Sequence, residues 1–334
     1  MKTSVIILNY NGKKYLEKFL PILIAHTPDV EIIIVDNASD DDSVLFLKQQ
    51  FPLLRLIIFS KNFGFAQGYR LALQQIESDI FVLLNSDIEV TDNWLSPLVD
   101  FLAQNHNVAA VQPKIKSYHQ KQYFEHAGAS GGFLDKYGYP FCRGRIFDFC
   151  EKDEKQYNKN IPIFWATGAC LVIKKNAYFE AGELDGYFFA HMEEIDLCWR
   201  LQNLGYEIYC IPESEIYHVG GGTLDKSNPF KTYLNFRNNL VMIFKNHPNY
   251  LLILFVRFFL DTLAWLVFLL KRKPKHSWAI TKAYFGFFKY IFSTKNKNMT
   301  IKKEKFNTQI GKNKLWKKSI VWEYFIKKRK KFEG

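Results

Sequence analysis

Several features that would assign this sequence to a common class of protein are missing. The five cysteines are odd in number and none form a C-x-x-C pair, so we expect reduced thiols in a cytosolic protein, not a disulfide framework or a zinc site. No signal peptide is expected, because Met1–Thr3 lead directly into a short apolar run. That run is not followed by G-x-G-x-x-G, which disfavours a nicotinamide or flavin enzyme.

Acidic residues are scarce in the C-terminal part of the chain. From Lys271 onward there are 20 Lys and Arg against 3 Asp and Glu, so this tail carries +17 and the preceding residues carry −5 of the total charge of +12. A mildly acidic domain is thus joined to a strongly basic tail. Such a tail favours a polyanionic partner, either a nucleic acid or an anionic membrane surface.

Short apolar runs alternate with helical patterns in the first third of the chain. The runs are rich in Ile, Val and Leu with little polar alternation, as in parallel strands covered on both faces. We expect strands at Ser4–Leu8, Glu31–Val35, Leu56–Phe59, Ile80–Leu84 and Val108–Val111. We expect helices at Lys13–Ala25, Ser43–Phe51 and Ala66–Ile76. This order predicts an α/β fold with a doubly wound sheet and right-handed crossovers.

The middle of the chain is less regular. Residues 113–162 predict loops and short strands that build an acceptor or sugar pocket. A strand is expected at Trp165–Lys174, reached through a turn at Gly168. Helices are expected at Phe188–Asn203 and Pro229–Lys245.

Polar residues follow four of the expected strands. In doubly wound sheets ligands bind at the carboxyl ends of the strands, so these residues should converge on one rim. They are Asn9 and Asn11 after the first strand, Asp36 after the second, Asn62 and Gly68 after the third, and Asn85, Ser86 and Asp87 after the fourth.

Two of these carboxylates have a functional and a structural interpretation. Asp87 at a strand tip can bind a hard cation that holds a diphosphate, although an aspartate there is also a common turn or cap residue. Asp36 can accept a hydrogen bond from an N–H of uracil or thymine, or it can form an Asx turn. The neighbouring Asp40–Asp42 are better explained as cap and first-turn charges of the next helix.

A second acidic cluster, Glu193-Glu194-Ile195-Asp196, begins the helix expected near residue 190. Transfer to a hydroxyl needs a base, and a carboxylate between aromatic residues can serve. First-turn acids can instead compensate the helix dipole. We assign Asp196 to a structural i,i+4 pair with Arg200, and one of Glu193 and Glu194 to catalysis.

Two later motifs can also contact a phosphate. His218 precedes three glycines, which let the backbone approach a ligand, so His218 can be a further metal ligand or a diphosphate donor. A single histidine is nevertheless more often structural. Arg237-Asn238 can contact phosphate, and a position on a helix surface explains this pair equally well.

The C-terminal region carries long apolar stretches. Leu251–Leu270 has 17 apolar residues among 20 and is long enough to span a bilayer, with Arg257 and Asp261 placed to pair on one face. Trp278–Phe292 is aromatic, and lysines spaced by seven residues, at positions 275, 282 and 289, form one stripe on a helix through this stretch. This pattern is typical of a helix in the membrane interface. Leu315–Phe332 repeats the combination of aromatic and basic residues.

A full span is disfavoured for Leu251–Leu270. Arg257 and Asp261 would be costly near the bilayer centre, and a single span would place the basic tail outside, against the positive-inside rule. We therefore expect a monotopic helix or a re-entrant pair with Trp278–Phe292. The expected location is the cytoplasmic side of the cell membrane, in peripheral or monotopic attachment.

Residues 3–245 resemble glycosyltransferase family 2, the inverting group with the GT-A fold, and within it the rhamnosyltransferase-like branch. The resemblance is carried by six segments in order, which end at His218. They are Val5–Gly12, Ile34–Asp40, Asn62–Gly68, Leu83–Asp87, Thr167–Leu171 and Glu193–Arg200.

The resemblance implies a role for each matching residue. Asp36 would read the pyrimidine base, and Asp87 would be the metal-binding carboxylate of a D-x-D motif whose first position is Asn85. The metal would be Mg²⁺ or Mn²⁺. Position 194 aligns with the presumed base, which makes Glu194 the first choice over Glu193. Asn9, Asn11, Asn62, Gly68, Ser86 and Gly168 would complete the nucleotide-sugar site, and His218 would lie near the metal.

The expected fold is therefore a GT-A type doubly wound mixed sheet over residues 1–245, with a nucleotide-binding half at 1–112 and an acceptor and catalytic half at 113–245. Residues 246–334 would form a helical, membrane-associating extension. The expected activity is inverting transfer of a sugar, with rhamnose among the candidates, from a UDP- or dTDP-sugar to a glycan or lipid-linked acceptor. The alternatives are a non-catalytic nucleotide-sugar-binding protein and a basic nucleic-acid-binding protein, and no nucleic acid is expected as a partner.

Overall fold

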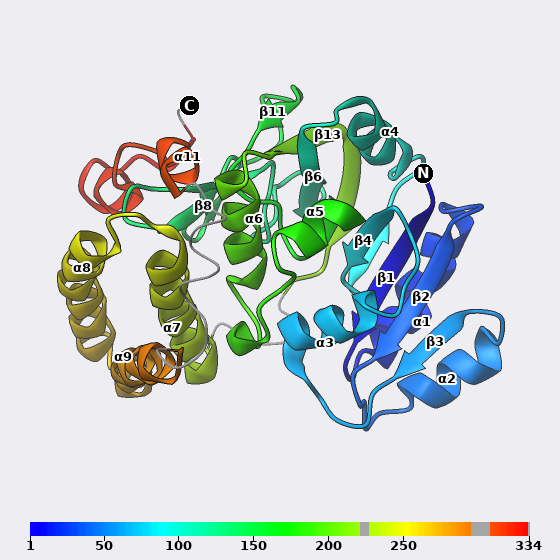
Figure 1. Cartoon of the computed structure of the whole chain (residues 1–334), viewed down its shortest axis with the longest axis horizontal. Coiled ribbons are helices and arrows are strands. Elements are labelled where there is room, and N and C mark those ends of the chain that lie inside the picture. Colours follow the sequence, from blue (N-terminus) through cyan, green and yellow to red (C-terminus); the bar gives the residue numbers. More distant parts are fainter. Residues whose placement is uncertain (221–226, 295–307, 333–334) are drawn as a thin grey trace.

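The computed structural model describes residues 1–220, 227–294 and 308–332. Its centre is a mixed sheet, to which nine of the strands belong, with helices on both faces (Figure 1). The strand order is β11-β13-β6-β12-β4-β1-β2-β3, and β5 pairs with β13 beside this path. The expected doubly wound mixed sheet is confirmed.

The first half of the sheet is parallel. It contains β1 (Thr3–Asn9), β2 (Glu31–Asp36), β3 (Arg55–Ile58) and β4 (Ile80–Leu84). The connecting helices are α1 (Lys13–Ala25), α2 (Ser43–Gln50) and α3 (Gly64–Leu73). Alternate residues of β1 enter two separate cores: Ile6 packs with Tyr69 of α3, whereas Val5 packs with Leu16 of α1. This burial on both faces explains the unbroken apolar runs.

The second half of the sheet is mixed. β12 (Cys170–Lys174) runs antiparallel between β4 and β6 (Val108–Ser117). β13 (Glu207–His218) continues the sheet parallel to β6, and β5 (Ile88–Val90) and β11 (Ile161–Pro162) pair with it in antiparallel register. One end of the long β13 therefore pairs with β5, which follows the turn after β4, and its other end pairs with the edge strand β11.

Some elements begin later than the sequence predicts. The strand expected from Trp165 begins at Cys170, because residues 167–169 form a turn. The helix expected from Phe188 begins at Glu193 as α6 (Glu193–Asn203), because Phe189, His191 and Met192 have positive φ angles that a helix does not allow.

Four helices and strands in the two halves were missed. They are β5, α4 (Ser96–Gln104), α5 (Lys175–Glu180) and β13. In β13 the residues Pro212, Glu213 and Glu215 interrupt the apolar pattern, and the pairing with β6 shifts register between Ile211 and Glu215. Such an irregular strand lacks the clean alternation on which sequence-based detection depends.

Residues 113–162 contain short strands, as expected. Four of them make a small second sheet: β7 (Gly132–Leu134), β8 (Pro140–Cys142), β9 (Arg145–Ile146) and β10 (Phe149–Cys150). The C-terminal segment packs on this sheet, with Trp316 against Phe141 and Phe332 stacked on Phe133. Among residues 308–332 the helical elements are α11 (Thr308–Asn313) and a π-helical turn at Trp322–Ile326.

The remaining helices form a group at one side of the molecule, at the left of Figure 1. α7 (Pro229–Asn246) packs on α6, and α8 (Tyr250–Leu270) and α9 (Pro274–Thr294) pack on α7. The expected pair of Arg257 and Asp261 is present at 3.0 Å and is buried against the domain, where Tyr139 and Tyr284 donate hydrogen bonds to Asp261. Within the described residues, α8 is the one helix long and apolar enough to cross a membrane.

Candidate active site

The ends of β1 and β2 form a connected polar network. Asn9 Nδ2 donates to Asp36 Oδ2 at 3.1 Å, and Ser39 donates to both oxygens of Asp36, from its backbone N at 2.9 Å and its Oγ at 2.7 Å. Asp36 has no exposed surface. Its carboxylate is therefore turned toward the turn that follows β2, as in the Asx-turn interpretation, and is not open at the rim.

The segment after β3 contributes less to the rim than the sequence predicts. Asn62 is exposed and accepts a hydrogen bond from Asn37, which ties the turns after β2 and β3 together. Gly68 is buried inside α3, where a Cβ atom would lie 2.9 Å from Leu8 of β1. Its assignment to ligand binding is corrected: the missing side chain allows close packing between helix and strand.

The turn after β4 lies beside the start of the second half of the domain. Asn85 donates its backbone N–H to the carbonyl of Ala169 at 3.0 Å, and the neighbouring Gly168 donates its backbone N–H to the carboxylate of Glu194. A Cβ atom on Gly168 would lie 3.1 Å from Phe65. Residues 85–87, 168 and 194, distant in sequence, therefore meet at one place.

Asp87 and His218 lie together on neighbouring chain segments. His218 ends β13 opposite Ile88 of β5, and its Nε2 lies 3.2 Å from Asp87 Oδ1. On the other side of the ring, Nδ1 lies 2.9 Å from Glu125 Oε2. Asp87 and His218 are each 6% exposed. A carboxylate that holds Nδ1 leaves Nε2 facing Asp87, which is the arrangement of a metal-ligating histidine with its supporting carboxylate.

The charges around His218 change its pKa and that of Glu125. Burial lowers the pKa of His218, but the carboxylates of Asp87 and Glu125 outweigh burial and raise it to about 10. Burial raises the pKa of Glu125, and the hydrogen bond from His218 outweighs it and lowers this pKa to about 2. A cation between Asp87 and Nε2 would take the place of the ring proton.

Glu193 and Glu194 open α6, and one carboxylate oxygen of each is shielded from water. An Oε2 atom of each is buried with no hydrogen-bond partner in the described part of the chain. Burial raises the pKa of both, and the charge of Glu194 raises that of Glu193 further. A carboxylate with a raised pKa and a vacant acceptor oxygen is suited to take a proton.

The structure confirms the pair of Asp196 with Arg200. Arg200 donates to Asp196 at 2.9 Å, and Lys245 and Asn246 of α7 each donate to the same carboxylate at 2.8 Å. Asp196 has no exposed surface. The donors from α7 fix α6 on that helix, which is a structural role.

A family model, "Glycosyl transferase family 2", matches residues 4–179, which is more than half of the chain. The chain belongs to this family. It is a glycosyltransferase.

Two relatives of known activity class are distant in sequence. An N-acetylglucosaminyl-diphospho-decaprenol L-rhamnosyltransferase of Mycobacterium tuberculosis is 24% identical over 230 residues, which are 64% of this chain and 75% of the relative. The low-salt glycan biosynthesis hexosyltransferase Agl10 of Haloferax volcanii is 23% identical over 246 residues, 71% of this chain and 74% of the relative.

Solved structures share the fold. GalNAc-T7, crystallised with UDP, GalNAc and Mn²⁺, superposes with a TM-score of 0.58 at 16% identity, over 75% of this chain and 49% of that protein. The mannosyltransferase PcManGT of Pyrobaculum calidifontis, in complex with GDP-Man and Mn²⁺, gives 0.51 at 14% identity, over 93% and 86%. Both comparisons support the GT-A architecture of this glycosyltransferase.

Two parts of the site were missed or left open by the sequence. Glu125 lies in the irregular stretch 113–162 and carries no motif, so only the fold places it against His218. Arg237 and Asn238 are buried, and they bind backbone carbonyls of residues 187–191. The helix-surface interpretation of this pair is therefore wrong.

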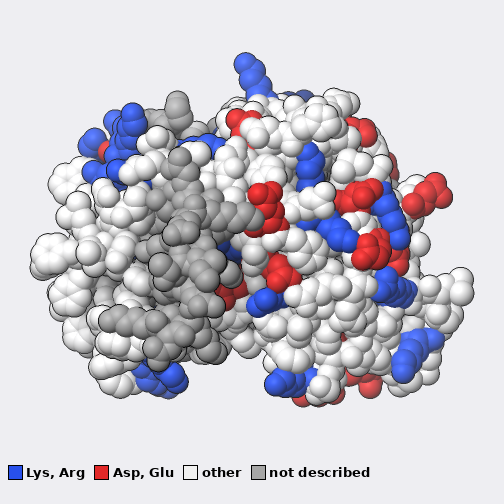
Figure 2. Space-filling model, viewed as in Figure 1, with Lys and Arg blue, Asp and Glu red and all other residues white. Residues whose placement is uncertain are grey.

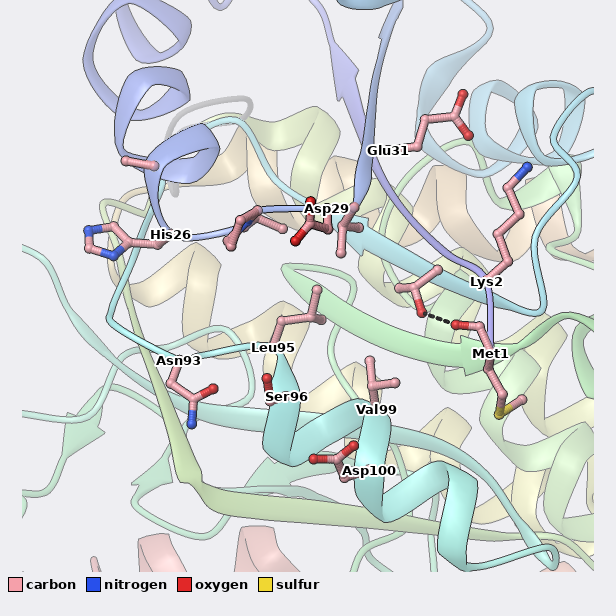
Figure 3. Close-up of a pocket in the computed structure, with 15 residues that line it drawn as sticks. Met1, Lys2, His26, Asp29, Glu31, Asn93, Leu95, Ser96, Val99 and Asp100 are labelled. Carbon is pink, nitrogen blue, oxygen red and sulfur yellow. Dashed lines mark hydrogen bonds between the residues drawn. The ribbon is translucent and has the colours of Figure 1, made fainter.

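A depression of about 690 Å³ lies elsewhere on the molecule (Figure 3). Its lining includes Thr3 and Glu31, which begin β1 and β2, together with His26 and Asp100. It is therefore at the amino edge of the parallel strands, opposite the rim formed by Asn9 and Asp36. Ligands of doubly wound sheets bind at the carboxyl edge, so this depression lies at the edge away from the candidate site.

Proposed function

We propose that this glycosyltransferase moves a hexose or deoxyhexose from a pyrimidine nucleotide diphosphate-sugar to a hydroxyl of a lipid-linked glycan precursor, with inversion at the anomeric carbon. The observation that carries the proposal is the meeting of three groups at the strand rim: the Asn85–Asp87 turn, His218, and Glu194 beside Gly168. Together they supply a place for a diphosphate and a place for a base.

The nucleotide would bind over the ends of β1 and β2. Asn9 Oδ1 is buried without a hydrogen-bond partner among the described residues, and Gly12 leaves the space beside it open, since a Cβ there would lie 2.3 Å from this oxygen. Asp36 has both oxygens engaged by Asn9 and Ser39. Reading a base N–H with Asp36 therefore requires the turn at Ser39 to open when the nucleotide enters.

Asp87 and His218 fit a divalent cation, Mg²⁺ or Mn²⁺. Within the described residues no group of three His, Cys, Asp or Glu side chains could enclose a metal. Two protein ligands suit a cation whose other positions are taken by water and by phosphate oxygens of the donor. Such a cation would stabilise the nucleoside diphosphate as the leaving group. The protein residues hold the site: Glu125 fixes the His218 ring, and the Asp87 carbonyl accepts the backbone N–H of Val219 at 3.1 Å.

Glu194 would be the base. Its contact with Gly168 places it beside the Asn85–Asp87 turn. The acceptor hydroxyl would donate its proton to Glu194 as its oxygen attacks the anomeric carbon. A single displacement of this kind inverts the configuration, and it needs no carboxylate nucleophile.

Attachment to a membrane would bring the enzyme to a lipid-linked acceptor. α8 buries Arg257 and Asp261 against the domain and exposes large apolar side chains on its other side, among them Phe255 at 63% and Phe259 at 58%. This side is pale in Figure 2 at the place of α8 in Figure 1, with Lys and Arg clusters above and below it. An apolar surface edged by basic groups supports peripheral or monotopic binding to an anionic cytoplasmic leaflet.

The base assignment is tested by single substitutions. Glu194→Gln keeps the size of the side chain but cannot take the proton, so kcat should fall about 100-fold or more, with donor binding unchanged. Glu193→Gln should lower kcat less. The measurement is release of nucleoside diphosphate from UDP- and dTDP-sugars with a polyprenyl-diphosphate-linked acceptor and Mn²⁺. Full activity of Glu194→Gln would remove this residue from the reaction.

A further inference from the structure

The segment just before the candidate base has an unusual backbone. Phe189 has φ 64° and ψ −63°, and the N–H of Ala190 donates to the carbonyl of Phe188 at 2.7 Å, which together define a γ-turn of the rare, strained kind. His191 and Met192 also have positive φ angles, 69° and 72°. Non-glycine residues rarely adopt positive φ angles, and here three of them do so within four positions. Such a conformation persists only when surrounding groups hold it.

Two side chains of α7 bind this segment. Asn238 Nδ2 lies 2.9 Å from the carbonyl oxygens of Phe188 and Ala190 and 2.7 Å from that of His191. Arg237 donates to the carbonyls of Tyr187 and Phe188 at 2.9 and 3.0 Å. Side chains of one helix therefore hold the carbonyls on both sides of the strained turn.

The amide of Asn238 is itself oriented. Arg237 Nε donates to its Oδ1 at 2.8 Å, which directs the Nδ2 atom toward the segment. Asn238 has no exposed surface, and Arg237 lies between the rings of Tyr187 and Tyr233. From the opposite side, the N–H groups of Phe65 and Ala66 in α3 hold the carbonyl of Phe189. The segment is thus fixed between the two halves of the domain.

We propose that Asn238, oriented by Arg237, is a positioning residue: it holds residues 188–192 in the strained conformation that sets the start of α6 and places Glu194 beside Gly168. Neither side chain touches the donor site at Asp87 or the network at Asp36. The proposal rests on the proposed function for its catalytic consequence, but not for the existence of the contacts.

The neighbouring Asn239 provides a matched control. It is also a buried asparagine of α7, its Nδ2 donates to the carbonyl of Gly138 at 2.7 Å, and its Oδ1 accepts from Arg257. Asn239→Ala therefore removes a buried amide of the same helix at a place remote from residues 188–192. A general loss of stability in α7 would affect both variants, whereas loss of positioning would affect Asn238→Ala alone.

The first readout is hydrogen–deuterium exchange of the full-length protein without substrate. Asn238→Ala should speed exchange of the amides of Ala190 and Asp196 by about tenfold or more, relative to Asn239→Ala. Equal exchange in the two variants would overturn the proposal that Asn238 holds residues 188–192, whether or not the protein transfers sugar.

The second readout separates positioning from donor binding. With Mn²⁺ and the sugar nucleotide that the wild type turns over, Asn238→Ala should lose about 100-fold in kcat while its donor dissociation constant stays within about twofold. Asn239→Ala should keep its kcat. An unchanged kcat in Asn238→Ala would overturn the proposal. If the wild type turned over no sugar nucleotide, the proposed function would fail. The exchange experiment alone would then decide whether Asn238 holds residues 188–192.

Discussion

Glu193 is a carboxylate whose burial costs stability when it is ionised. Its pKa is raised in the folded protein by burial and by Glu194, whereas the pKa of a glutamate in an unfolded chain is about 4.3. Below that value both states are protonated and there is no penalty. As the pH rises above it, the unfolded chain ionises first, so the folded state becomes progressively less favoured up to the folded pKa.

Glu193→Gln should therefore stabilise the protein more at high pH than at low pH. The melting temperature of the variant minus that of the wild type should increase between about pH 5 and pH 8, by on the order of 2 °C. Thermal unfolding followed by circular dichroism across this range would measure it. A difference that stays constant or shrinks with pH would mean that this carboxylate is not held in its neutral form by its surroundings.

Glu125 acts on the candidate metal site through His218. Glu125→Ala removes the acceptor for the ring Nδ1, so His218 can rotate and its Nε2 becomes a poorer ligand; Mn²⁺ affinity should fall about 10–100-fold. Glu125→Gln keeps an acceptor oxygen and should lose less. Calorimetric titration with Mn²⁺ in the presence of UDP would compare them. Wild-type affinity in Glu125→Ala would show that the contact does not support metal binding.

At the scale of helices and strands, the sequence predicted those elements whose residue pattern is compatible with a single type of structure. The apolar strands β1, β2 and β4 and the pair of Arg257 with Asp261 follow directly from spacing. The start of α6 did not, because Phe188–Met192 is apolar and aromatic enough to continue a helix. Contacts with α7, distant in sequence, hold that segment out of the helix, and such tertiary contacts have no local signal.

The exposed apolar side chains of α8 and α9 predict that the protein binds membranes. The protein should float with vesicles that contain phosphatidylglycerol and less with pure phosphatidylcholine vesicles, since apolar burial and basic groups act together. Phe255→Gln with Phe259→Gln should weaken binding by about tenfold or more. Leu45→Gln with Leu53→Gln, at exposed apolar positions on another face, is the control.

The vesicle experiment also separates the two polyanions that the basic tail could bind. Salt-sensitive binding to RNA without any vesicle binding would contradict the membrane proposal and favour the nucleic-acid alternative. Equal vesicle binding by the two double variants would mean that α8 is not the contact surface, even if the protein binds membranes through other residues.

At the scale of the whole molecule, the site is assembled from segments that the sequence separates by up to about 200 residues. The polar strand ends could be expected to meet, because parallel strands share one carboxyl edge. The approach of Glu125 to His218 and of Asn238 to the segment before α6 could not, since both depend on how the second half folds over the first. The inward orientation of the Asp36 carboxylate likewise depends on the hydrogen bonds that Ser39 donates to it.

The most direct test of the account is a binding titration of UDP-, dTDP- and GDP-sugars, with and without Mn²⁺, on the wild type and on Asp87→Ala. The account predicts Mn²⁺-dependent binding of a pyrimidine nucleotide sugar that Asp87→Ala loses, because this carboxylate and His218 are the two candidate protein ligands of the cation. Metal-independent binding, or full binding by Asp87→Ala, would contradict the assignment of the donor site to the rim of β1, β2 and β4.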